Sequence, residues 1–550
     1  MWWWGMAFAQ DAGESKGPSV TFTNDVELRY WQVDQRLPDP DDVPVFDYWE
    51  QVDRLNTVVS EGIFTASLQL DEVALWANRY YLDDVLFVER ELVTPGTPTP
   101  FPTGVDVYLN PEKVSGRFEL PHATIVLGDA YVAFGRGLAL NLNRNVDIDI
   151  DTSLQGVKAV LRPGAWDLTL VAATANRQQV FQDNPNIGIY GDLRHRVAGV
   201  RAERFGLGPA NIGAHGVVYD FVETTGFASF ADDPVAADAI VGGATTELIG
   251  VAGIDWFVEG DVYSYGHDLA LPDTSPLGYA GYLSAAGYPG PFVILVEGKR
   301  YLGVERVNSK LTPELYEVSV GPTLEYERVI LEDTSAAVNS NDIWGARVQV
   351  DWTAVPGKLV PYVAVATFRD LDTTGLHFND VPETIGHLTT GLEYIDGDRA
   401  VLFNTGVRVD DRDGNTDGAD RLVHADLSTN FPLPGGLLAY VSAASRYFAW
   451  GVNGDLQQAP FGDAESSWGL TRGKVTGTVS LDWTANPLVR STGNLSDSVY
   501  IGGELQVKPA RAWTVKAFYG AQKAGIRCSG GQCRTLPGFE GLRLSAVGTF

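Results

Sequence analysis

A charged, alternating stretch is the strongest candidate in this sequence for a site that handles ions. Its ionisable residues are Arg136, Arg144, Asp147, Asp149 and Asp151. Single aliphatic residues separate the three aspartates, so in an extended chain their carboxylates share one side. If that side faces a lumen, the row predicts a charged constriction of the kind that sets ion preference in pores. A solvated loop tip or a salt-bridge network on an inner wall explains the same pattern.

Other residues that often carry catalysis lack the spacing that catalysis needs. The histidines show no spacing typical of metal ligands; they are His122, His195, His215, His267, His377, His387 and His424. His424, Asp426 and Ser428 share one face of a strand but lie too far apart for a proton relay, so a polar row lining a lumen is the better interpretation. Residues 13–17 spell G-x-S-x-G without the strand and helix of a hydrolase elbow. We therefore predict that the chain is not an enzyme.

A cluster of Asp, Asn and Gly resembles the first half of a calcium-binding loop. Its candidate ligands are Asp413, Asn415, Asp417 and Asp420. The bidentate glutamate expected at the twelfth position is absent, because His424 stands there. Such clusters are also ordinary surface turns. A calcium ion and a plain turn both stay open here, and no other cofactor is indicated.

Two cysteines, Cys528 and Cys533, lie close together in an expected surface loop. An exported compartment is oxidising, and two cysteines alone do not build a structural metal site. The favoured interpretation is a disulfide that pins the last hairpin, and two free thiols are the alternative.

The last strand indicates the architecture that positions these residues. In residues 538–550, apolar and glycine positions at Leu542, Leu544, Ala546, Gly548 and Phe550 alternate with more polar ones. An open edge strand is an aggregation hazard that barrel closure removes, and in a bilayer only helices and closed barrels satisfy the backbone. The strand also resembles the terminal strands that the barrel-assembly machinery of Gram-negative bacteria recognises. That resemblance implies this machinery as a partner during biogenesis and Phe550 as part of the assembly signal.

Connections along the chain alternate between short and long. The short turns, rich in Gly and Pro, are expected at 61–62, 121–122, 162–165, 206–209, 287–290, 355–358, 396–398, 433–436 and 508–510. The long connections are expected at 34–53, 81–111, 178–194, 224–243, 304–340, 370–383, 411–419, 450–462, 486–496 and 524–537. This asymmetry is typical of bacterial barrels, which have short periplasmic turns and long surface loops.

The pattern predicts an all-β fold: one large, closed, antiparallel transmembrane β-barrel of about 24 strands, with a range of about 20 to 26. A soluble β-sandwich shows similar alternation, but its strands are shorter and its loops do not sort by length. Two pieces, 137–144 and 322–331, are ambiguous as strands.

Composition agrees with a membrane barrel and excludes other classes. Acidic residues exceed basic ones by 70 − 40 = 30, which argues against a nucleic-acid partner. No run approaches the about 18 apolar residues of a membrane helix. Residues 7–9 read Ala-Phe-Ala, so we expect residues 1–17 to be the remainder of a signal peptide and a mobile leader, and 18–550 to be the barrel. A merely hydrophobic N-terminal piece is the alternative.

Three internal stretches and the closing strand resemble a domain family of unknown function, made of large outer-membrane β-barrel proteins of Gram-negative bacteria. The stretches are 126–140, 151–163 and 525–534. The resemblance implies a barrel in the bacterial outer membrane, in contact with its lipids. It implies no function, because no catalytic or ligand residues of the family can be transferred.

Two functions follow from this architecture. The first is a porin-like channel or transporter for a small solute, with selectivity set by lumen charge and shape. The second is a plugged barrel that conducts nothing and docks a partner at the surface. A barrel of this width has an open lumen unless something fills it, and inward folding of 81–111 and 304–340 is the expected way to fill it.

Overall fold

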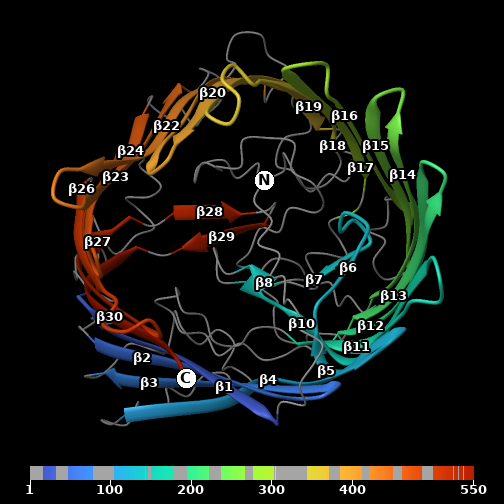
Figure 1. The fold of residues 1–550 in the computed structure, drawn as a ribbon, viewed down its shortest axis with the longest axis horizontal. Helices are drawn as coiled ribbons and strands as arrows, with labels where there is room; N and C mark the ends of the chain where they lie inside the picture. The colour runs from blue at the N-terminus through green and yellow to red at the C-terminus, as the bar shows by residue number, and fades with distance from the viewer. Residues whose placement is uncertain are drawn as a thin grey trace, which may run out of the picture.

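The computed structural model describes residues 17–32, 48–77, 105–142, 144–145, 150–176, 195–221, 237–266, 277–302, 304, 343–370, 384–411, 420–449, 461–485, 499–523, 525–529, 532–536 and 538–550. These residues form a 24-stranded antiparallel sheet that closes on itself, because β1 pairs with β30 as well as with β2 (Figure 1). The predicted closed barrel and its strand number are confirmed. Among the described residues, no helix is long and apolar enough to span a membrane.

The wall strands follow the chain in order around the barrel. They are β1 (Ser19–Trp31), β2 (Tyr48–Glu61), β3 (Phe64–Ala77), β4 (Val105–Leu120), β5 (Ala123–Ala130), β10 (Ser153–Leu161), β11 (Trp166–Asn176), β12 (Arg196–Leu207), β13 (Ala210–Phe221), β14 (Ala237–Val251), β15 (Ile254–Tyr265), β16 (Leu277–Gly287), β17 (Phe292–Leu302), β18 (Ile343–Trp352), β19 (Leu359–Asp370), β20 (Thr384–Asp396), β21 (Arg399–Asp411), β22 (Asp420–Leu433), β23 (Leu437–Ala449), β24 (Phe461–Arg472), β25 (Val475–Thr484), β26 (Val499–Val507), β27 (Trp513–Gln522) and β30 (Phe539–Thr549).

Six shorter strands lie outside the wall sheet. They are β6 (Val132–Phe134), β7 (Leu140–Leu142), β8 (Arg144–Asn145), β9 (Ile150–Asp151), β28 (Gly525–Ser529) and β29 (Gln532–Leu536), and they pair as β6–β7, β8–β9 and β28–β29. Viewed down the barrel, these pairs project inside the ring of wall strands (Figure 1). The ambiguous piece 137–144 is therefore not a wall strand, and 322–331 lies outside the described residues.

Short turns and long connections alternate around the barrel, as predicted. β1 begins and β30 ends at the short-turn edge, because Ser19 pairs with Ser60 and Thr23 with Thr549. Two further short turns were not predicted, at 252–253 and 473–474. Two long connections were also not predicted, 131–152 between β5 and β10 and 267–276 between β15 and β16, and 267–276 lies outside the described residues.

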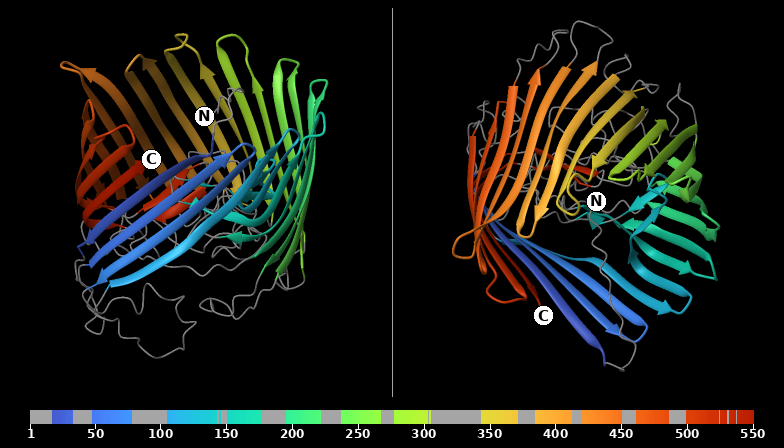
Figure 2. Two further views of the ribbon diagram at one scale, coloured as in Figure 1. Left: turned by 60° about the horizontal axis from the view of Figure 1, so that its bottom comes forward. Right: turned by 45° about the horizontal axis from the view of Figure 1, so that its top comes forward.

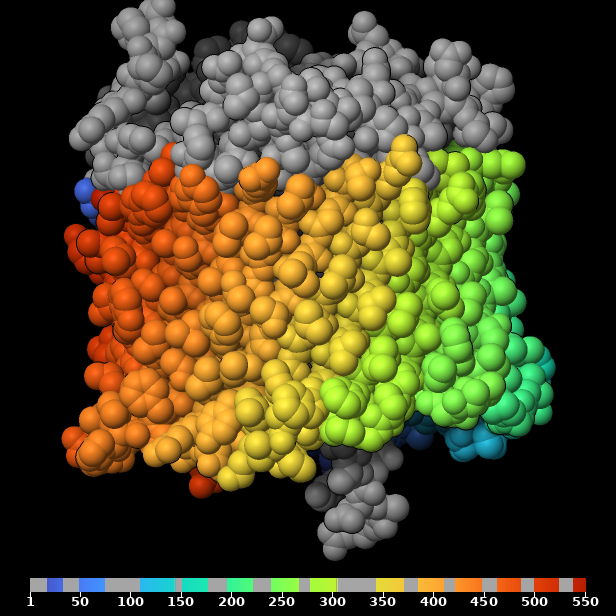
Figure 3. Space-filling model, turned by 90° about the horizontal axis from the view of Figure 1, so that it is seen from above, coloured from blue at the N-terminus to red at the C-terminus, as the bar shows by residue number. Residues whose placement is uncertain are grey.

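The outer face of the wall is apolar and bordered by aromatic residues at both edges. On β18, Trp344 and Trp352 are 45% and 48% exposed. They stand about 26 Å apart along the strand at about 3.3 Å per residue, which is about 20 Å in height at a strand tilt of about 40° and lies within the about 25 Å apolar band of a membrane barrel. Further exposed aromatics near the short turns are Phe22, Phe64, Trp166, Phe292 and Phe550, and near the other edge Trp49, Tyr447, Trp483 and Tyr519. Figures 2 and 3 show the wall strands slanting across this surface.

Candidate functional site

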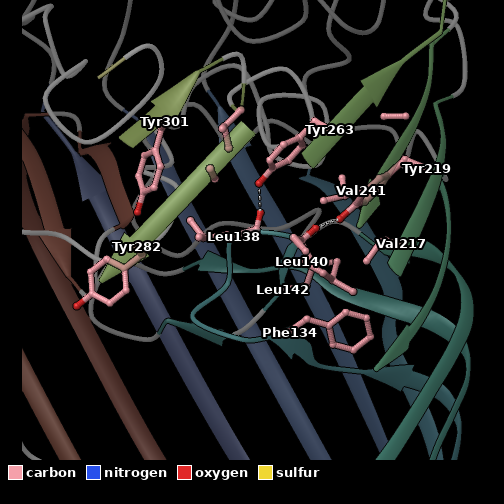
Figure 4. Close-up of a cluster of buried hydrophobic side chains, with 14 of the residues drawn as sticks. Phe134, Leu138, Leu140, Leu142, Val217, Tyr219, Val241, Tyr263, Tyr282 and Tyr301 are labelled. Carbon is pink, nitrogen blue, oxygen red and sulfur yellow. Dashed lines mark hydrogen bonds between the residues drawn. The ribbon is translucent and has the colours of Figure 1, made fainter. Parts of the chain in front are cut away.

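Residues 131–142, here called the inward segment, leave the wall after β5 and pack against its inner face. Phe134, Leu138 and Leu140 are almost fully buried. The Phe134 ring lies over Gly199 of β12, where an added Cβ would come within 2.9 Å of the ring. Glycine at this position therefore lets the segment approach the wall closely. Figure 4 shows the segment's apolar side chains facing β13, β14 and β15.

Tyrosines on the inner face bind the backbone of the inward segment. The Tyr263 hydroxyl donates to the Leu138 carbonyl at 2.7 Å, and the Tyr219 hydroxyl donates to the Ala139 carbonyl (Figure 4). Both tyrosines are fully buried, so these bonds satisfy carbonyl groups that would otherwise be costly to desolvate. We call this face of β13–β17 the tyrosine wall, formed by Tyr219, Tyr263, Tyr265, Tyr282 and Tyr301.

Asp151 anchors the chain where it returns to the wall. Its carboxylate accepts hydrogen bonds from Lys113 of β4 and from the Tyr131 hydroxyl, and Arg144 lies 3.4 Å from its other oxygen. Lys113 also donates to the Asp151 carbonyl at 2.8 Å. Asp151 is 3% exposed and is thus an ion-paired anchor.

The other members of the expected constriction are placed only in part. The Arg136 backbone N–H donates to Glu259 at 2.6 Å, and its guanidinium lies over the Phe257 ring at 4.8 Å from the ring centroid. Asp147 and Asp149 lie outside the described residues. The charged constriction therefore stays a prediction.

A second region of the inner face is held together by ion pairs. The Arg54 guanidinium of β2 forms a bidentate ion pair with the Asp71 carboxylate of β3. Its Nη2 donates to Oδ2 at 2.8 Å and its Nε donates to Oδ1 at 3.1 Å. Glu50 accepts hydrogen bonds from Arg29 at 3.1 Å and from the Trp31 indole at 2.8 Å. All of these groups are buried. We call this face of β1–β3 the ion-paired wall, formed by Arg29, Glu50, Arg54 and Asp71.

A comparable cluster lies beside β24, at the end of β27. The Lys523 ammonium lies 2.6 Å from Asp463 and 3.0 Å from Glu465. Burial lowers the pKa of Lys523, but these two carboxylates outweigh burial and raise it above its usual value. The positive charge is therefore held on the inner face at neutral pH.

The remaining predicted sites have different outcomes. Cys528 and Cys533 are direct cross-strand partners in β28–β29, a spacing that a disulfide spans; the bond itself stays a prediction. Asp413, Asn415 and Asp417 lie outside the described residues, and only the backbone of Asp420 is described, at the start of β22.

Phe550 exchanges backbone hydrogen bonds with Phe22 of β1 at 2.8 and 2.9 Å, and its ring packs near Trp513 of β27. Its side chain is 57% exposed on the outer face. The closing-strand geometry matches the sequence pattern, and the role as assembly signal stays a prediction.

Two side-chain pairs on the inner face escaped the sequence analysis. His215 of β13 contacts Asp261 of β15 at 2.5 Å across Gly243, and His387 contacts His424 at 2.9 Å across Gly406. Each pair joins alternate strands, which is possible because the residue between them has no side chain. Spacing along the chain carries no sign of this, since strand register creates both pairs. An inward-facing glycine between polar strand positions is the signal that could have revealed them.

Comparison with known structures finds similarities at low sequence identity. The translocation pore of the P pilus usher PapC matches 96% of this chain and 99% of its own, with 8% identity and a TM-score of 0.40. The outer membrane protein opdK from Pseudomonas aeruginosa matches 75% and 97%, with 10% identity and a TM-score of 0.38. The copper transporter OprC matches 98% and 83%, with 9% identity and a TM-score of 0.43.

No protein-family model matches the sequence. No curated protein matches it either. The resemblance to a family of unknown function thus stays a prediction.

Proposed function

We propose that this chain is a channel of the bacterial outer membrane that passes a small polar solute, and that the inward segment narrows its lumen. The observation that carries the proposal is the width of the wall. A closed barrel of 24 strands encloses more space than its own inward side chains fill. The apolar outer belt supports contact with membrane lipids, and the alternation of short turns with long connections favours the outer membrane.

Charged side chains on the inner face are held in fixed positions. Buried ion pairs such as Arg54–Asp71 fix charged groups on the wall, where they shape the potential that a permeating solute meets. The inward segment packs against the tyrosine wall, whereas the charges of the ion-paired wall pair with one another. Selectivity would then arise on the side of the lumen that carries fixed charge.

Single-channel recording in planar bilayers tests this function. We expect discrete conductance steps and, under a salt gradient, a reversal potential that shows cation preference. The double variant Asp147→Asn, Asp149→Asn should weaken that preference; Asp151 is left in place because its carboxylate anchors the chain through Lys113. Complete absence of conductance from correctly folded protein would contradict the channel and favour the surface scaffold.

A further inference from the structure

Three ionisable side chains meet beneath the inward segment on the tyrosine wall. Register places His215 of β13, Gly243 of β14 and Asp261 of β15 side by side. Glu259 lies two residues before Asp261 and shares its face. One possible ligand atom from each of the three ionisable residues lies within 4.8 Å of the others.

Glycine at 243 makes this meeting possible. An added Cβ there would lie 1.9 Å from Asp261 Oδ1 and 2.6 Å from His215 Nε2, which no real side chain tolerates. Gly135 of the inward segment likewise leaves room for Glu259, since a Cβ added at Gly135 would lie 2.0 Å from Glu259 Oε1. Glycine backbone therefore borders the three groups on two sides.

The three side chains are deeply buried and incompletely satisfied. Glu259, Asp261 and His215 are 1%, 3% and 7% exposed. Among the described residues, no hydrogen-bond partner reaches Glu259 Oε1, Asp261 Oδ2 or His215 Nδ1. Buried carboxylate oxygens without partners are costly, and two neighbouring carboxylates also repel each other. A bound cation would remove both costs.

Nearby arginines are engaged with other groups. Arg201, which faces His215 across β12 and β13, forms an ion pair with Glu203 at 2.5 Å. The Arg136 guanidinium stacks over Phe257, and only its backbone N–H reaches Glu259. Among the described residues, neither arginine side chain forms an ion pair with Glu259 or Asp261.

We propose that His215, Glu259 and Asp261 bind a divalent transition-metal ion of the zinc class. One imidazole nitrogen and two carboxylate oxygens form a mixed donor set that suits Zn²⁺ and related ions, with water completing the coordination. Because Glu259 also accepts the Arg136 N–H, a bound ion would hold the carboxylate that anchors the inward segment. The site would thus couple metal binding to the position of that segment.

Metal titration of the purified full-length protein, stripped with a chelator, tests the site without any conductance measurement. We expect the wild type to bind one more Zn²⁺ per chain than His215→Gln or Asp261→Asn, or to bind it at least tenfold more tightly. His122→Gln, which removes an exposed histidine in the β4–β5 turn, is the matched control and should behave like the wild type. Co²⁺ in place of Zn²⁺ should give a visible absorption band that only the two site variants lose.

Equal uptake by the wild type and His215→Gln would overturn the proposal, because it would show only non-specific binding to an acidic chain. No uptake by the wild type at micromolar free Zn²⁺ would overturn it too. The wild-type titration decides even if a variant fails to fold, and circular dichroism identifies such a failure.

Discussion

The tyrosine wall and the ion-paired wall are built from the same kind of strand but are stabilised in opposite ways. The tyrosine wall packs against the inward segment through aromatic and aliphatic side chains. Its tyrosine hydroxyl groups donate hydrogen bonds to backbone carbonyls of that segment. The ion-paired wall has its charges neutralised within the sheet, by residues on neighbouring strands. The inner face of one barrel therefore combines a region that packs against a separate segment with a region whose charges are paired within the sheet.

The largest expected loss of stability comes from removing one partner of a buried ion pair on the ion-paired wall. Asp71→Ala leaves the buried Arg54 guanidinium without its partner, which should cost about 3–5 kcal/mol of stability. Replacing both partners by apolar residues, as in Arg54→Met with Asp71→Leu, should recover most of that loss. Unfolding of reconstituted protein in urea measures both variants.

The exposed pair Arg196–Asp220 is the matched control, and Asp220→Ala should cost about 1 kcal/mol or less. A single variant Asp71→Ala as stable as the wild type would show that the ion-paired wall is not held by this pair.

A smaller effect is expected on the covered side. Phe134→Ala removes a fully buried ring and should cost about 3 kcal/mol, spent mainly on releasing the inward segment. Hydrogen exchange should therefore rise in residues 131–142 and stay unchanged in β1–β3. Leu127→Ala, an exposed outer-face residue, should leave the exchange of the segment unaltered. Uniform loss of protection around the barrel would mean that the segment is part of one cooperative unit.

The smallest expected loss of stability comes from adding one methyl group where the Phe134 ring contacts Gly199. Gly199→Ala adds a methyl group that would lie 2.9 Å from the Phe134 ring, and this overpacking should cost about 1–3 kcal/mol. Gly216→Ala is the control, because its Cβ would meet only a carbonyl oxygen at 3.8 Å. Thermal unfolding curves compare the two. Equal stability of the two variants would show that the Phe134 ring does not lie over Gly199.

Much of the barrel could be predicted because its signals are local. Most positions of the closing strand alternate between apolar and more polar residues, and most turns carry Gly and Pro that supply the required dihedral angles. The turn at 252–253 was missed because Ala252 adopts a positive φ of 57°, which an alanine gives no reason to expect. The piece 137–144 was ambiguous because an inward-packed strand alternates much as a wall strand does.

The candidate site was harder to predict because it depends on register. The sequence left open a salt-bridge network around Asp151, but it did not indicate Lys113 as the partner, because only folding brings Lys113 to it from β4. Likewise, 46 residues separate His215 from Asp261, and their contact depends on the two strand pairings of β14. Long-range pairing of this kind leaves no trace in local composition.

The most direct test of the account measures conductance when the inward segment is released. The double variant Tyr219→Phe, Tyr263→Phe removes the two hydroxyl groups that bind the segment's carbonyls, at a cost of about 1–3 kcal/mol for each unsatisfied carbonyl. Tyr440→Phe, on the outer face, is the control. We expect larger or more frequently fluctuating single-channel currents for the double variant only. Currents identical to those of the wild type would contradict the claim that the inward segment narrows a conducting lumen.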